Sequence, residues 1–345
     1  MSDDRTGISR RRRGKGFSYH RSDGELIRDP DERRRIDGLA IPPAYRDVWI
    51  CPDARGHLQA TGRDDKGRKQ YIYHPQWQVL RGRNKFEHLL TFAEVLPGIR
   101  HRVQRDLGRE GMSREKVLAA VVTLLESTLA RVGNTSYARD NGSYGLTTIR
   151  KRHVEVDENA VVFEFQGKGG QEWRVQTDDE RIAEVVRQCV EIPGYELFKY
   201  FDDQGTKRDV DSGDVNDYLR ELAGKEITAK DFRTWAGTVL CAEALCEQPF
   251  ASDSQARKNV VAAVKRVAGT LGNTPSVCRE SYVHPVVIET YLEGALVESL
   301  RTEAPRKIAA ADEQALSGNG KAGGRLLRGI EAGVLRLLGL RAGNS

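Results

Sequence analysis

The spacing of apolar side chains changes its period partway along the chain, and this change constrains the fold more than any other feature. Over residues 17–73, short alternating segments are interrupted by Gly, Pro and Asp, as in antiparallel strands joined by turns. Beyond Pro97-Gly98 the apolar residues recur mainly with the period of a helix. The sequence therefore predicts an α+β protein with two domains, a small antiparallel β-sheet domain over 17–96 and a larger, mainly helical domain over 97–303.

Individual elements of the larger domain can be placed from caps and periodicity. One helix follows Ser113, whose side chain can cap it, and it is expected to end near Gly133, where glycine suits a left-handed terminal residue. Strands over 161–165 and 172–176, joined by a turn around 167–170, predict a β-hairpin. Further helices are expected over about 76–90, 178–190, 212–223, 228–246, 254–271 and 286–300.

Both ends of the chain differ from the two domains. Residues 1–16 contain the basic run Arg10–Arg13 and are expected to form a flexible tail. Residues 304–345 are rich in Ala and Gly and contain one amphipathic segment, which is expected to dock on the protein rather than to bind a partner. Its apolar face consists of Leu326, Leu327, Ile330, Val334, Leu337 and Leu338.

Charge is distributed unevenly along the 345 residues. The first 90 residues carry 20 Lys and Arg against 13 Asp and Glu, a net charge of +7, whereas the remainder carries 35 against 37, a net charge of −2. A basic N-terminal part suits a polyanionic partner, although a solvated charged surface is the commoner explanation of a basic run.

Composition also bounds the compartment and the kinds of site. No apolar run reaches the ~20 residues that span a bilayer, and no apolar segment follows the basic N-terminus, so a cytoplasmic protein without a membrane partner is expected. The five cysteines are scattered and never spaced as C-x-x-C, which argues against disulfides and against a zinc site.

Five segments carry side chains that could act on a phosphate ester. The sequence has no Walker loop, HExxH, GxSxG or acidic cluster with metal-ligand spacing, so an enzyme of this kind would have to activate phosphate with organic cations rather than Mg²⁺. The candidate segments are LARVGN (Arg131), FQGKGGQ (Lys168), TAKDFRTW (Arg233), GTLGNTP (Asn273) and RESYVHP (Tyr282).

Each candidate also has an ordinary structural explanation when it is taken alone. A cation at a helix end or in a turn commonly caps carbonyls or faces solvent, which covers Arg131 and Lys168. Arg233 would pair with a nearby carboxylate on the surface, Asn273 would serve a turn, and Tyr282 would be a core tyrosine with a satisfied hydroxyl. It is the order of the five segments and their contexts that favours a shared function.

Taken together, the five segments resemble those of the type IB DNA topoisomerases of the small bacterial and poxvirus-like kind. That family has Arg in RxGN, Lys in a GK hairpin turn, Arg in KDxRTW, Asn or His in LGNTP and Tyr in SYxHP, and the same order and similar spacing occur here. The resemblance runs from about Phe17 to Tyr291. It implies relaxation of supercoiled duplex DNA by transient cleavage of one strand, without ATP, a cofactor or an obligatory metal. It also implies a monomer whose two lobes form a clamp around double-stranded DNA.

The resemblance further implies a role for each candidate. Tyr282 would attack a backbone phosphorus, form a 3′-phosphotyrosyl link and release a 5′-hydroxyl. The guanidinium forks of Arg131 and Arg233 would stabilise charge on the non-bridging oxygens. Lys168 would protonate the leaving oxygen, and Asn273 would donate a neutral hydrogen bond. Eukaryotic and poxviral members carry His where this chain has Asn, so an acid role is not expected at that position.

The segment KGRKQYIYH is similar to the DNA-gripping strand of the same family. Alternate side chains of a strand share one face, and a strand can enter the major groove. For KQYIY alone, a plain amphipathic strand is the alternative. The residues that the resemblance places on DNA are Gln70, Tyr71 and Tyr73 in the groove, Lys66, Arg68 and Lys69 near phosphates, and Tyr137 and Lys230 elsewhere.

Two other functions fit part of the pattern. A tyrosine recombinase shares the Arg–Lys–Arg–Tyr chemistry, but its HxxR motif is replaced here by the residues 230–233, KDFR, and the β-rich N-terminal part favours a topoisomerase. A DNA-binding architectural protein with an inactive site would not need all five candidates. A type IB topoisomerase acting at the nucleoid is therefore the preferred interpretation.

Overall fold

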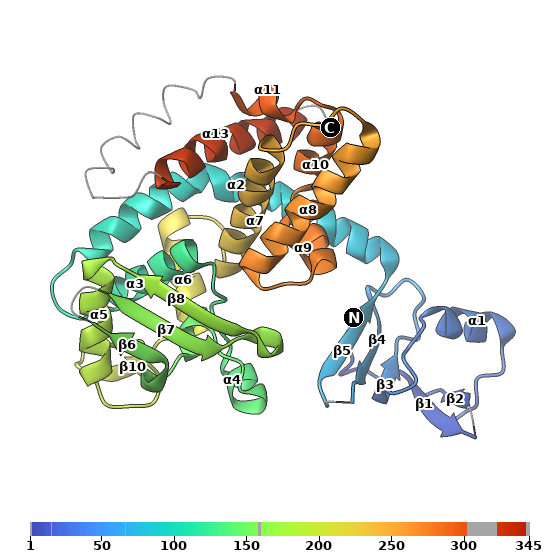
Figure 1. Cartoon of the computed structure of the whole chain (residues 1–345). Helices are drawn as coiled ribbons and strands as arrows, with labels where there is room; N and C mark the ends of the chain where they lie inside the picture. The colour runs from blue at the N-terminus through green and yellow to red at the C-terminus, as the bar shows by residue number, and fades with distance from the viewer. Residues whose placement is uncertain (1, 15, 66, 158–159, 302–322, 343–345) are drawn as a thin grey trace. The chain divides into compact units, whose positions relative to one another are not determined.

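The structure is a computed structural model of the whole chain, and it describes residues 2–14, 16–65, 67–157, 160–301 and 323–342 (Figure 1). Within these ranges, the backbone alone is described at 78–85, 87, 136–137, 140 and 323–328. The chain forms two compact units, Met1–Phe86 and Glu87–Ser345. The first is a β-sheet unit and the second is mainly helical, so the α+β prediction is confirmed.

The first unit is built on an antiparallel sheet of five strands in the order β2-β1-β3-β4-β5. Helix α1 (Pro30–Gly38) begins after Asp29, whose side chain accepts a hydrogen bond from the Asp31 amide. The strands are β1 (Ile8–Arg13), β2 (Gly16–His20), β3 (Arg46–Ile50), β4 (Leu58–Arg63) and β5 (Lys69–Tyr73). The core that joins sheet and helix consists of Ile8, Tyr19, Ile27, Ile36, Val48, Ile50 and Ala60.

The N-terminal basic run belongs to this sheet, so residues 8–13 form a strand instead of the flexible tail expected over 1–16. β1 pairs with β2 on one side and with β3 on the other. Ile8 is buried in the core, and the Arg10 guanidinium donates hydrogen bonds to three backbone carbonyls of the segment 41–45. The four consecutive arginines did not suggest a strand. The side chains that this strand turns inward are Ile8 and Arg10, and Arg10 is hydrogen-bonded to backbone carbonyls.

Helix α2 (Pro75–Leu107) runs through the domain boundary expected at Pro97. A proline inside a helix costs ~3 kcal/mol or more, because it lacks an N–H and its ring clashes with the preceding turn. Around this proline, Phe92, Leu96 and Ile99 are almost fully buried, and burying each such side chain stabilises the fold by about 1.5–3 kcal/mol. Packing therefore outweighs the proline, and the division between the two units lies earlier in α2.

The second unit is mainly helical and contains the predicted hairpin (Figure 1). The hairpin strands are β7 (Val161–Gln166) and β8 (Glu172–Thr177), to which β6 (Val154–Val156) adds a third strand. A separate pair is formed by β9 (Lys199–Phe201) and β10 (Lys207–Asp209). The other helices are α3 (Arg114–Thr128), α4 (Thr135–Asn141), α5 (Glu180–Glu191), α6 (Ser212–Ala223), α7 (Ala229–Cys246), α8 (Asp253–Leu271), α9 (Pro275–Tyr282), α10 (Pro285–Leu292), α11 (Leu296–Arg301) and α13 (Gly323–Ala342).

Most of the predicted helices are confirmed, with differences at their ends. Ser113 caps α3 by accepting a hydrogen bond from the Lys116 amide, as expected. The helix ends earlier than expected, because Leu129, with φ of 58°, takes the left-handed position assigned to Gly133. The helix predicted over 286–300 is divided into α10 and α11 by a glycine with φ of 76°. Helices α1, α4 and α9 were not predicted.

The C-terminal helix α13 packs on the second unit, as expected for the amphipathic segment. Val334, Leu337 and Leu338 are buried, whereas the side chains of Leu326 and Leu327 lie outside the described residues. In the part of the chain that the structure describes, no helix has the length and apolar character needed to cross a membrane.

Candidate active site

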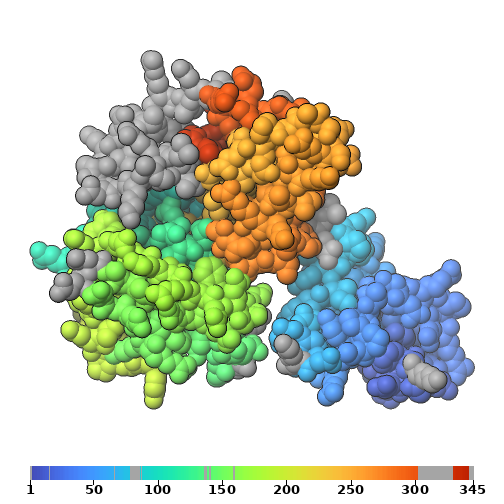
Figure 2. All heavy atoms as spheres, viewed as in Figure 1, coloured from blue at the N-terminus to red at the C-terminus, as the bar shows by residue number. Residues whose placement is uncertain are grey.

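Four of the five candidates meet where helices of the second unit end or begin. Arg131 follows α3, Arg233 lies near the start of α7, Asn273 follows α8, and Tyr282 ends α9. Figure 2 shows α8 and α9 in orange and the β7–β8 hairpin in light green, both at the surface of this unit. The contacts described next bring the four side chains into one cluster.

Arg233 is buried, with only 3% of its surface exposed, rather than paired on the surface as an isolated arginine would be. Its guanidinium donates hydrogen bonds to the carbonyls of Leu129 and Leu271, the latter at 2.5 Å. These carbonyls lie at the C-terminal ends of α3 and α8, where helix carbonyls lack partners and the helix dipole is negative. Two helix ends therefore hold this cation in one orientation.

Arg131 is held by the turn that follows α8. Its guanidinium donates hydrogen bonds to the Gly272 carbonyl at 3.3 Å and to Asn273 Oδ1 at 2.6 Å. The backbone also passes very close to Gly145, because a Cβ there would lie 2.5 Å from the Arg131 carbonyl oxygen. The Leu146 amide donates to the same oxygen at 2.9 Å. Glycine at position 145 thus permits the chain path that presents Arg131.

Asn273 supplies one of the three buried donors of this cluster that have no partner among the described residues. Its backbone amide donates to the Ala268 carbonyl at 2.9 Å, and its Oδ1 accepts from Arg131. Its Nδ2, together with Arg131 Nη1 and Arg233 Nε, is buried without a hydrogen-bond partner. Buried donors in proteins are nearly always satisfied. This cluster is therefore complementary to a ligand that carries several acceptor oxygens.

Tyr282 is the last residue of α9, one of the helices that periodicity did not predict. Thr274 caps α9 by accepting a hydrogen bond from the Val277 amide, and Pro275 occupies the first helical position. Both residues belong to the motif LGNTP, which therefore starts a helix as well as ending one. The centre of the Tyr282 ring lies 5.4 Å from the guanidinium carbon of Arg233. The phenol is thus carried into the cluster by a short capped helix.

Two residues of α7 that the sequence interpretation did not single out support Tyr282. Gly237 leaves room for the α9 backbone, and Thr238 Oγ1 lies 3.4 Å from the Tyr282 carbonyl oxygen. The same Thr238 oxygen accepts a hydrogen bond from the His284 amide at 3.1 Å. A glycine inside a helix costs ~1 kcal/mol relative to alanine and usually has a packing reason. The glycine in RTWAG is the signal that could have revealed this contact.

Electrostatics of the cluster also favour an anion. Burial lowers the pKa of Arg131, and burial together with the charge of Arg131 lowers the pKa of Arg233 to about 10. Both groups remain cationic at neutral pH. The Tyr282 phenol acts in the other direction and raises the pKa of each arginine, because it stabilises the charged guanidinium. Two like charges in one buried cluster are stabilised by a negative group placed between them.

Lys168 stays outside the buried cluster, but its turn is anchored beside it. Lys168 begins the turn between β7 and β8 with an exposed side chain. Gly169 and Gly170 have φ of 81° and 80°, a conformation that glycine adopts without strain. At the end of the turn, Gln171 lies against Gly272, where a Cβ would be 2.4 Å from Gln171 Oε1. The exposed lysine therefore sits on a turn whose base touches the loop that holds Arg131.

The strand predicted to grip DNA is β5, at the edge of the sheet in the first unit. Tyr71 and Tyr73 stack on one face with ring centroids 6.2 Å apart, and Tyr71 is 48% exposed. Tyr73 is half-buried, so the exposed part of this aromatic pair on the edge strand is mainly the Tyr71 ring.

The basic side chains around β5 are paired with carboxylates. Arg68 and Gln70 bind Asp64 at 2.7 and 2.9 Å, and Lys69 binds Asp3 at 2.5 Å. The hydrogen bond from Arg68 is the main cause of the fall in the pKa of Asp64 to about 2. A phosphate contact would therefore have to replace these ion pairs. Of the remaining predicted contacts, Lys230 is exposed near the start of α7, whereas Lys66 and the Tyr137 side chain lie outside the described residues.

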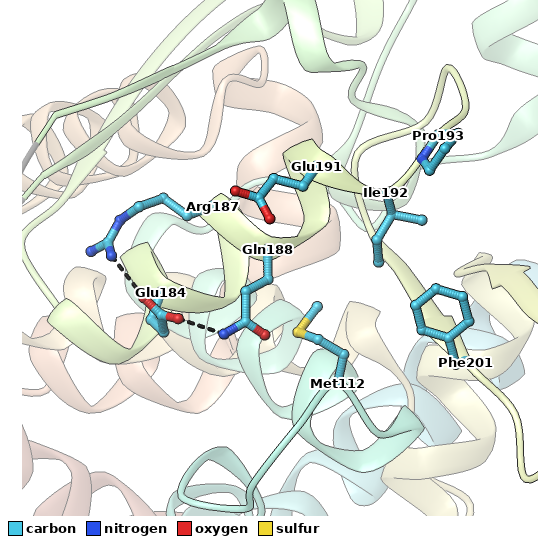
Figure 3. Close-up of a pocket in the computed structure, with 8 residues that line it drawn as sticks. All are labelled: Met112, Glu184, Arg187, Gln188, Glu191, Ile192, Pro193 and Phe201. Atoms are coloured by element: carbon cyan, nitrogen blue, oxygen red, sulfur yellow. Dashed lines mark hydrogen bonds and ion pairs between the residues drawn. The ribbon is translucent and has the colours of Figure 1, made fainter. Parts of the chain in front are cut away.

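A separate groove of about 790 Å³ lies beside α5 and β9 (Figure 3). The Arg187 guanidinium in it donates a hydrogen bond to Glu184 at 2.7 Å, and Glu191 adds a second carboxylate. Met112, Ile192, Pro193, Phe201 and Gln188 complete the lining. None of the predicted site residues lines this groove, and its carboxylates would repel a phosphate. The helix-end cluster is therefore the candidate active site.

A tyrosine beside one buried and one half-buried guanidinium group, in a helical unit that follows a β-sheet unit, is typical of proteins that transfer DNA strands through a tyrosine. Comparison with family models narrows this class. Residues 74–303 match the model for the eukaryotic DNA topoisomerase I catalytic core, and residues 16–64 match that for the bacterial DNA topoisomerase IB N-terminal domain. The chain belongs to the type IB DNA topoisomerase family, and it is an enzyme of the DNA topoisomerase class.

Individual relatives agree with this assignment. DNA topoisomerase 1B of Acanthamoeba polyphaga mimivirus is 31% identical over 293 residues, which cover 83% of this chain and 87% of the viral one. DNA topoisomerase 1B of vaccinia virus (strain Copenhagen) is 22% identical over 251 residues, or 71% of this chain and 75% of the relative. DNA topoisomerase I of monkeypox virus is 21% identical over 254 residues, with the same coverage.

Proposed function

We propose that this protein relaxes supercoiled duplex DNA by cutting and rejoining one strand, with Tyr282 as the nucleophile. The observation that carries the proposal is the set of three buried, unpartnered donors beside the Tyr282 ring, contributed by Arg131, Arg233 and Asn273. A phosphodiester offers non-bridging oxygens to these donors and a phosphorus atom to the phenol. Membership of the type IB family supports the same reaction.

In the cleavage step, Tyr282 Oη bonds to phosphorus while the bond from phosphorus to the 5′ oxygen breaks. The products are a 3′-phosphotyrosyl link and a 5′-hydroxyl; the phenolic proton passes to water, and Lys168 supplies the proton of the hydroxyl. Charge that grows on the non-bridging oxygens is stabilised by Arg131 and Arg233, with a neutral hydrogen bond from Asn273. Rejoining reverses these steps, so one ester is exchanged for another and no ATP is consumed.

Lys168 has to reach the leaving oxygen from an exposed position. Its turn contains two glycines with positive φ, which can change conformation at low cost, while Gln171 keeps the base of the turn against Gly272. DNA bound at the cluster would supply the negative charge that attracts the lysine. The acid would thus be completed only in the complex.

Double-stranded DNA is the proposed partner, gripped by β5 of the first unit and cut by the second. Between cleavage and rejoining, the free 5′ end rotates about the intact strand and releases torsion. The two units would close on the duplex as a clamp, and a single copy of the chain supplies every group used in the mechanism.

The test begins with plasmid relaxation in EDTA without ATP, on a plasmid that carries no paired recombination sites. Wild-type protein is expected to relax it, and detergent added during the reaction should trap protein on the 3′ end of a nicked strand. Tyr282→Phe should bind DNA with unchanged affinity and form no adduct. Relaxation by Tyr282→Phe, or strict dependence on Mg²⁺ or on paired sites, would refute the proposal.

A further inference from the structure

The C-terminal helix α13 lies beyond the residues that match the family's catalytic-core model, which end at 303. In the structure it packs on the same unit as the site, in contact with α7, α10 and α11 (Figure 1). Gly333 approaches the Leu300 backbone closely, since a Cβ there would be 2.9 Å from the Leu300 carbonyl oxygen. Arg336 donates a hydrogen bond to the Ser299 carbonyl at 2.6 Å. This helix is therefore a fitted part of the catalytic unit.

Glu331 of α13 joins two helices of the catalytic unit. Its two carboxylate oxygens accept hydrogen bonds from the Arg100 guanidinium of α2 at 2.9 and 3.0 Å. One of them also accepts the indole N–H of Trp235, in α7, at 2.9 Å. The carboxylate is only 15% exposed. Glu331 thus forms a forked ion pair with α2 and a hydrogen bond with α7 from one position.

The Arg100 side chain is held in place by two carboxylates, Glu331 and Glu126. Its Nε donates to Glu126 of α3 at 2.6 Å, so the guanidinium is shared between two carboxylates. Burial acts to lower the pKa of Arg100, but the charges and hydrogen bonds of Glu126 and Glu331 raise it above its ordinary value. The cation is therefore permanent, and it fixes the carboxylate of Glu331 relative to α2 and α3.

Trp235 connects this contact to the site. It follows Arg233 by two residues in α7, so the two side chains leave the helix about 200° apart. Arg233 points to the ends of α3 and α8 and to Tyr282, whereas Trp235 points to Glu331. Phe92 of α2 packs edge-on against Phe232 on the same stretch of α7, with ring centroids 5.0 Å apart. Glu331 and Phe92 thus contact one side of α7, and the carbonyls that bind Arg233 contact another, so the rotation of α7 about its axis is fixed.

We propose that Glu331 is a positioning residue for DNA cleavage. By holding the Trp235 indole from behind, it sets the rotation of α7 and with it the direction in which Arg233 presents its unpartnered Nε–H to the phosphate. The inference rests on the proposed function of Arg233. It assigns to the C-terminal helix a role in the reaction itself, because a small misplacement of a charged group at the reacting phosphate slows the step strongly.

The test measures the rate of covalent adduct formation in a single turnover, with full-length protein saturating the DNA. Glu331→Ala should form the adduct about 10- to 100-fold more slowly while binding DNA with unchanged affinity. Trp235→Phe replaces the indole with a smaller aromatic ring that has no N–H, and it should be slowed in the same direction. Glu331→Gln still offers the indole an acceptor, so it should recover most of the rate.

A matched control and a double-mutant cycle separate positioning from general stability. Arg341→Ala removes another contact of α13, the ion pair with Glu293 at 2.8 Å, which involves no residue of α7, and it should react at the wild-type rate. In an Arg233→Ala background, Glu331→Ala should slow the reaction less than twofold. In a Lys168→Ala background the two losses should multiply, because they act through different groups.

Three results would overturn the inference: an unchanged rate for Glu331→Ala, an equal loss in Arg341→Ala, or full multiplication of the losses in the Arg233→Ala background. If Glu331→Ala does not fold, the Glu331→Gln and Trp235→Phe pair decides, since equal rates in the two variants contradict the proposal. Failure of the proposed function itself is seen separately, as a wild-type protein that forms no adduct or a Tyr282→Phe variant that forms one.

Discussion

Gly237 of α7 lies so close to Tyr282 that a Cβ at position 237 would stand 2.5 Å from the Tyr282 carbonyl oxygen and 3.1 Å from its Cβ. A Cβ is not tolerated 2.5 Å from a carbonyl oxygen, so α9 can carry Tyr282 to Arg233 only because α7 has no side chain at this point. The contact fixes the nucleophile through the backbone, independently of the phenol's own partners.

Gly237→Ala is therefore expected to push the end of α9 away from α7. Overpacking of this kind destabilises a protein by about 1–3 kcal/mol, and the displaced tyrosine should form the covalent adduct at least ~10-fold more slowly. Denaturant unfolding and single-turnover adduct formation measure the two effects. Gly269→Ala in α8 is the matched control, because nothing lies within 4 Å of a Cβ there. Equal behaviour of the two variants would contradict the role given to Gly237.

Replacement of Lys168 tests the acid. Lys168→Ala should slow cleavage of a normal phosphodiester, but the loss should largely disappear when the leaving 5′ oxygen is replaced by sulfur, which needs little protonation. Arg233→Ala serves as the comparison, because its loss of charge stabilisation should persist with the sulfur substrate. Rates of adduct formation on both substrates give the answer. A Lys168 defect that survives the sulfur substitution takes the acid role away from this residue.

Substitutions of Asn273 can distinguish the role of its amide oxygen, which accepts from Arg131, from that of its amide nitrogen, which has no partner in the described part of the chain. Asn273→Asp keeps an acceptor for Arg131 but replaces the unpartnered Nδ2 donor with a negative charge. It should fold as well as the wild type and yet react more slowly than Asn273→Ala, because the added charge repels the phosphate. If Asp is faster than Ala, the main task of Asn273 is to hold Arg131 rather than to bind an oxygen. Adduct rates and thermal unfolding of both variants distinguish the cases.

DNA affinity is expected to depend on β5 and cleavage on the helix-end cluster. Arg68→Ala and Lys69→Ala should each reduce the salt dependence of binding by roughly one unit of slope, if each contacts a phosphate. Arg34→Ala, an exposed arginine of α1 paired with Asp31, is a control with the same change in charge and should leave the slope unaltered. Binding isotherms at several salt concentrations provide the measurement. If the slope is unchanged in all three variants, Arg68 and Lys69 do not contact DNA phosphates.

The resemblance of their motifs to a known family singled out Arg131, Arg233 and Asn273, but the helix ends beside them were also predictable, because turn and capping residues leave a local mark in the sequence. The hairpin that carries Lys168 was predicted for the same reason, since strands of alternating pattern flank a run of glycines. These features depend on neighbours within a few residues, and such neighbours are visible without a structure.

Features that depend on distant parts of the chain were not predictable in this way. The strand over 8–13 exists because residues far along the chain supply its partner β3 and the carbonyls that bind Arg10. Pro97 continues a helix because packing against other helices compensates for it. The contact of Gly237 with Tyr282 and the contact of Glu331 with Trp235 join positions separated by many residues, and no local pattern records them.

The last prediction concerns stability and pH. His284 caps α10 through Nδ1, which accepts a hydrogen bond from the Val286 amide at 3.2 Å, and burial lowers the pKa of this histidine to about 4. A histidine in the unfolded chain has a pKa of about 6.5. Between these values the unfolded state binds the proton more readily. The contribution of His284 to stability is therefore complete above about pH 6.5 and is lost as the pH falls toward 4, by on the order of 2 kcal/mol.

His284→Asn is the variant that isolates this effect. Asparagine is a good helix cap and does not titrate, so the cap should survive while the pH dependence is removed. Protonation would place a proton on His284 Nδ1, the atom that accepts the hydrogen bond from the Val286 amide. Because His284 lies two residues after Tyr282, loss of this bond would loosen the end of α9. Denaturant unfolding at pH 7 and pH 4.5 should show a smaller loss of stability in the variant than in the wild type. Equal losses in the two proteins would mean that folding does not change the pKa of His284 and that other groups govern the acid sensitivity.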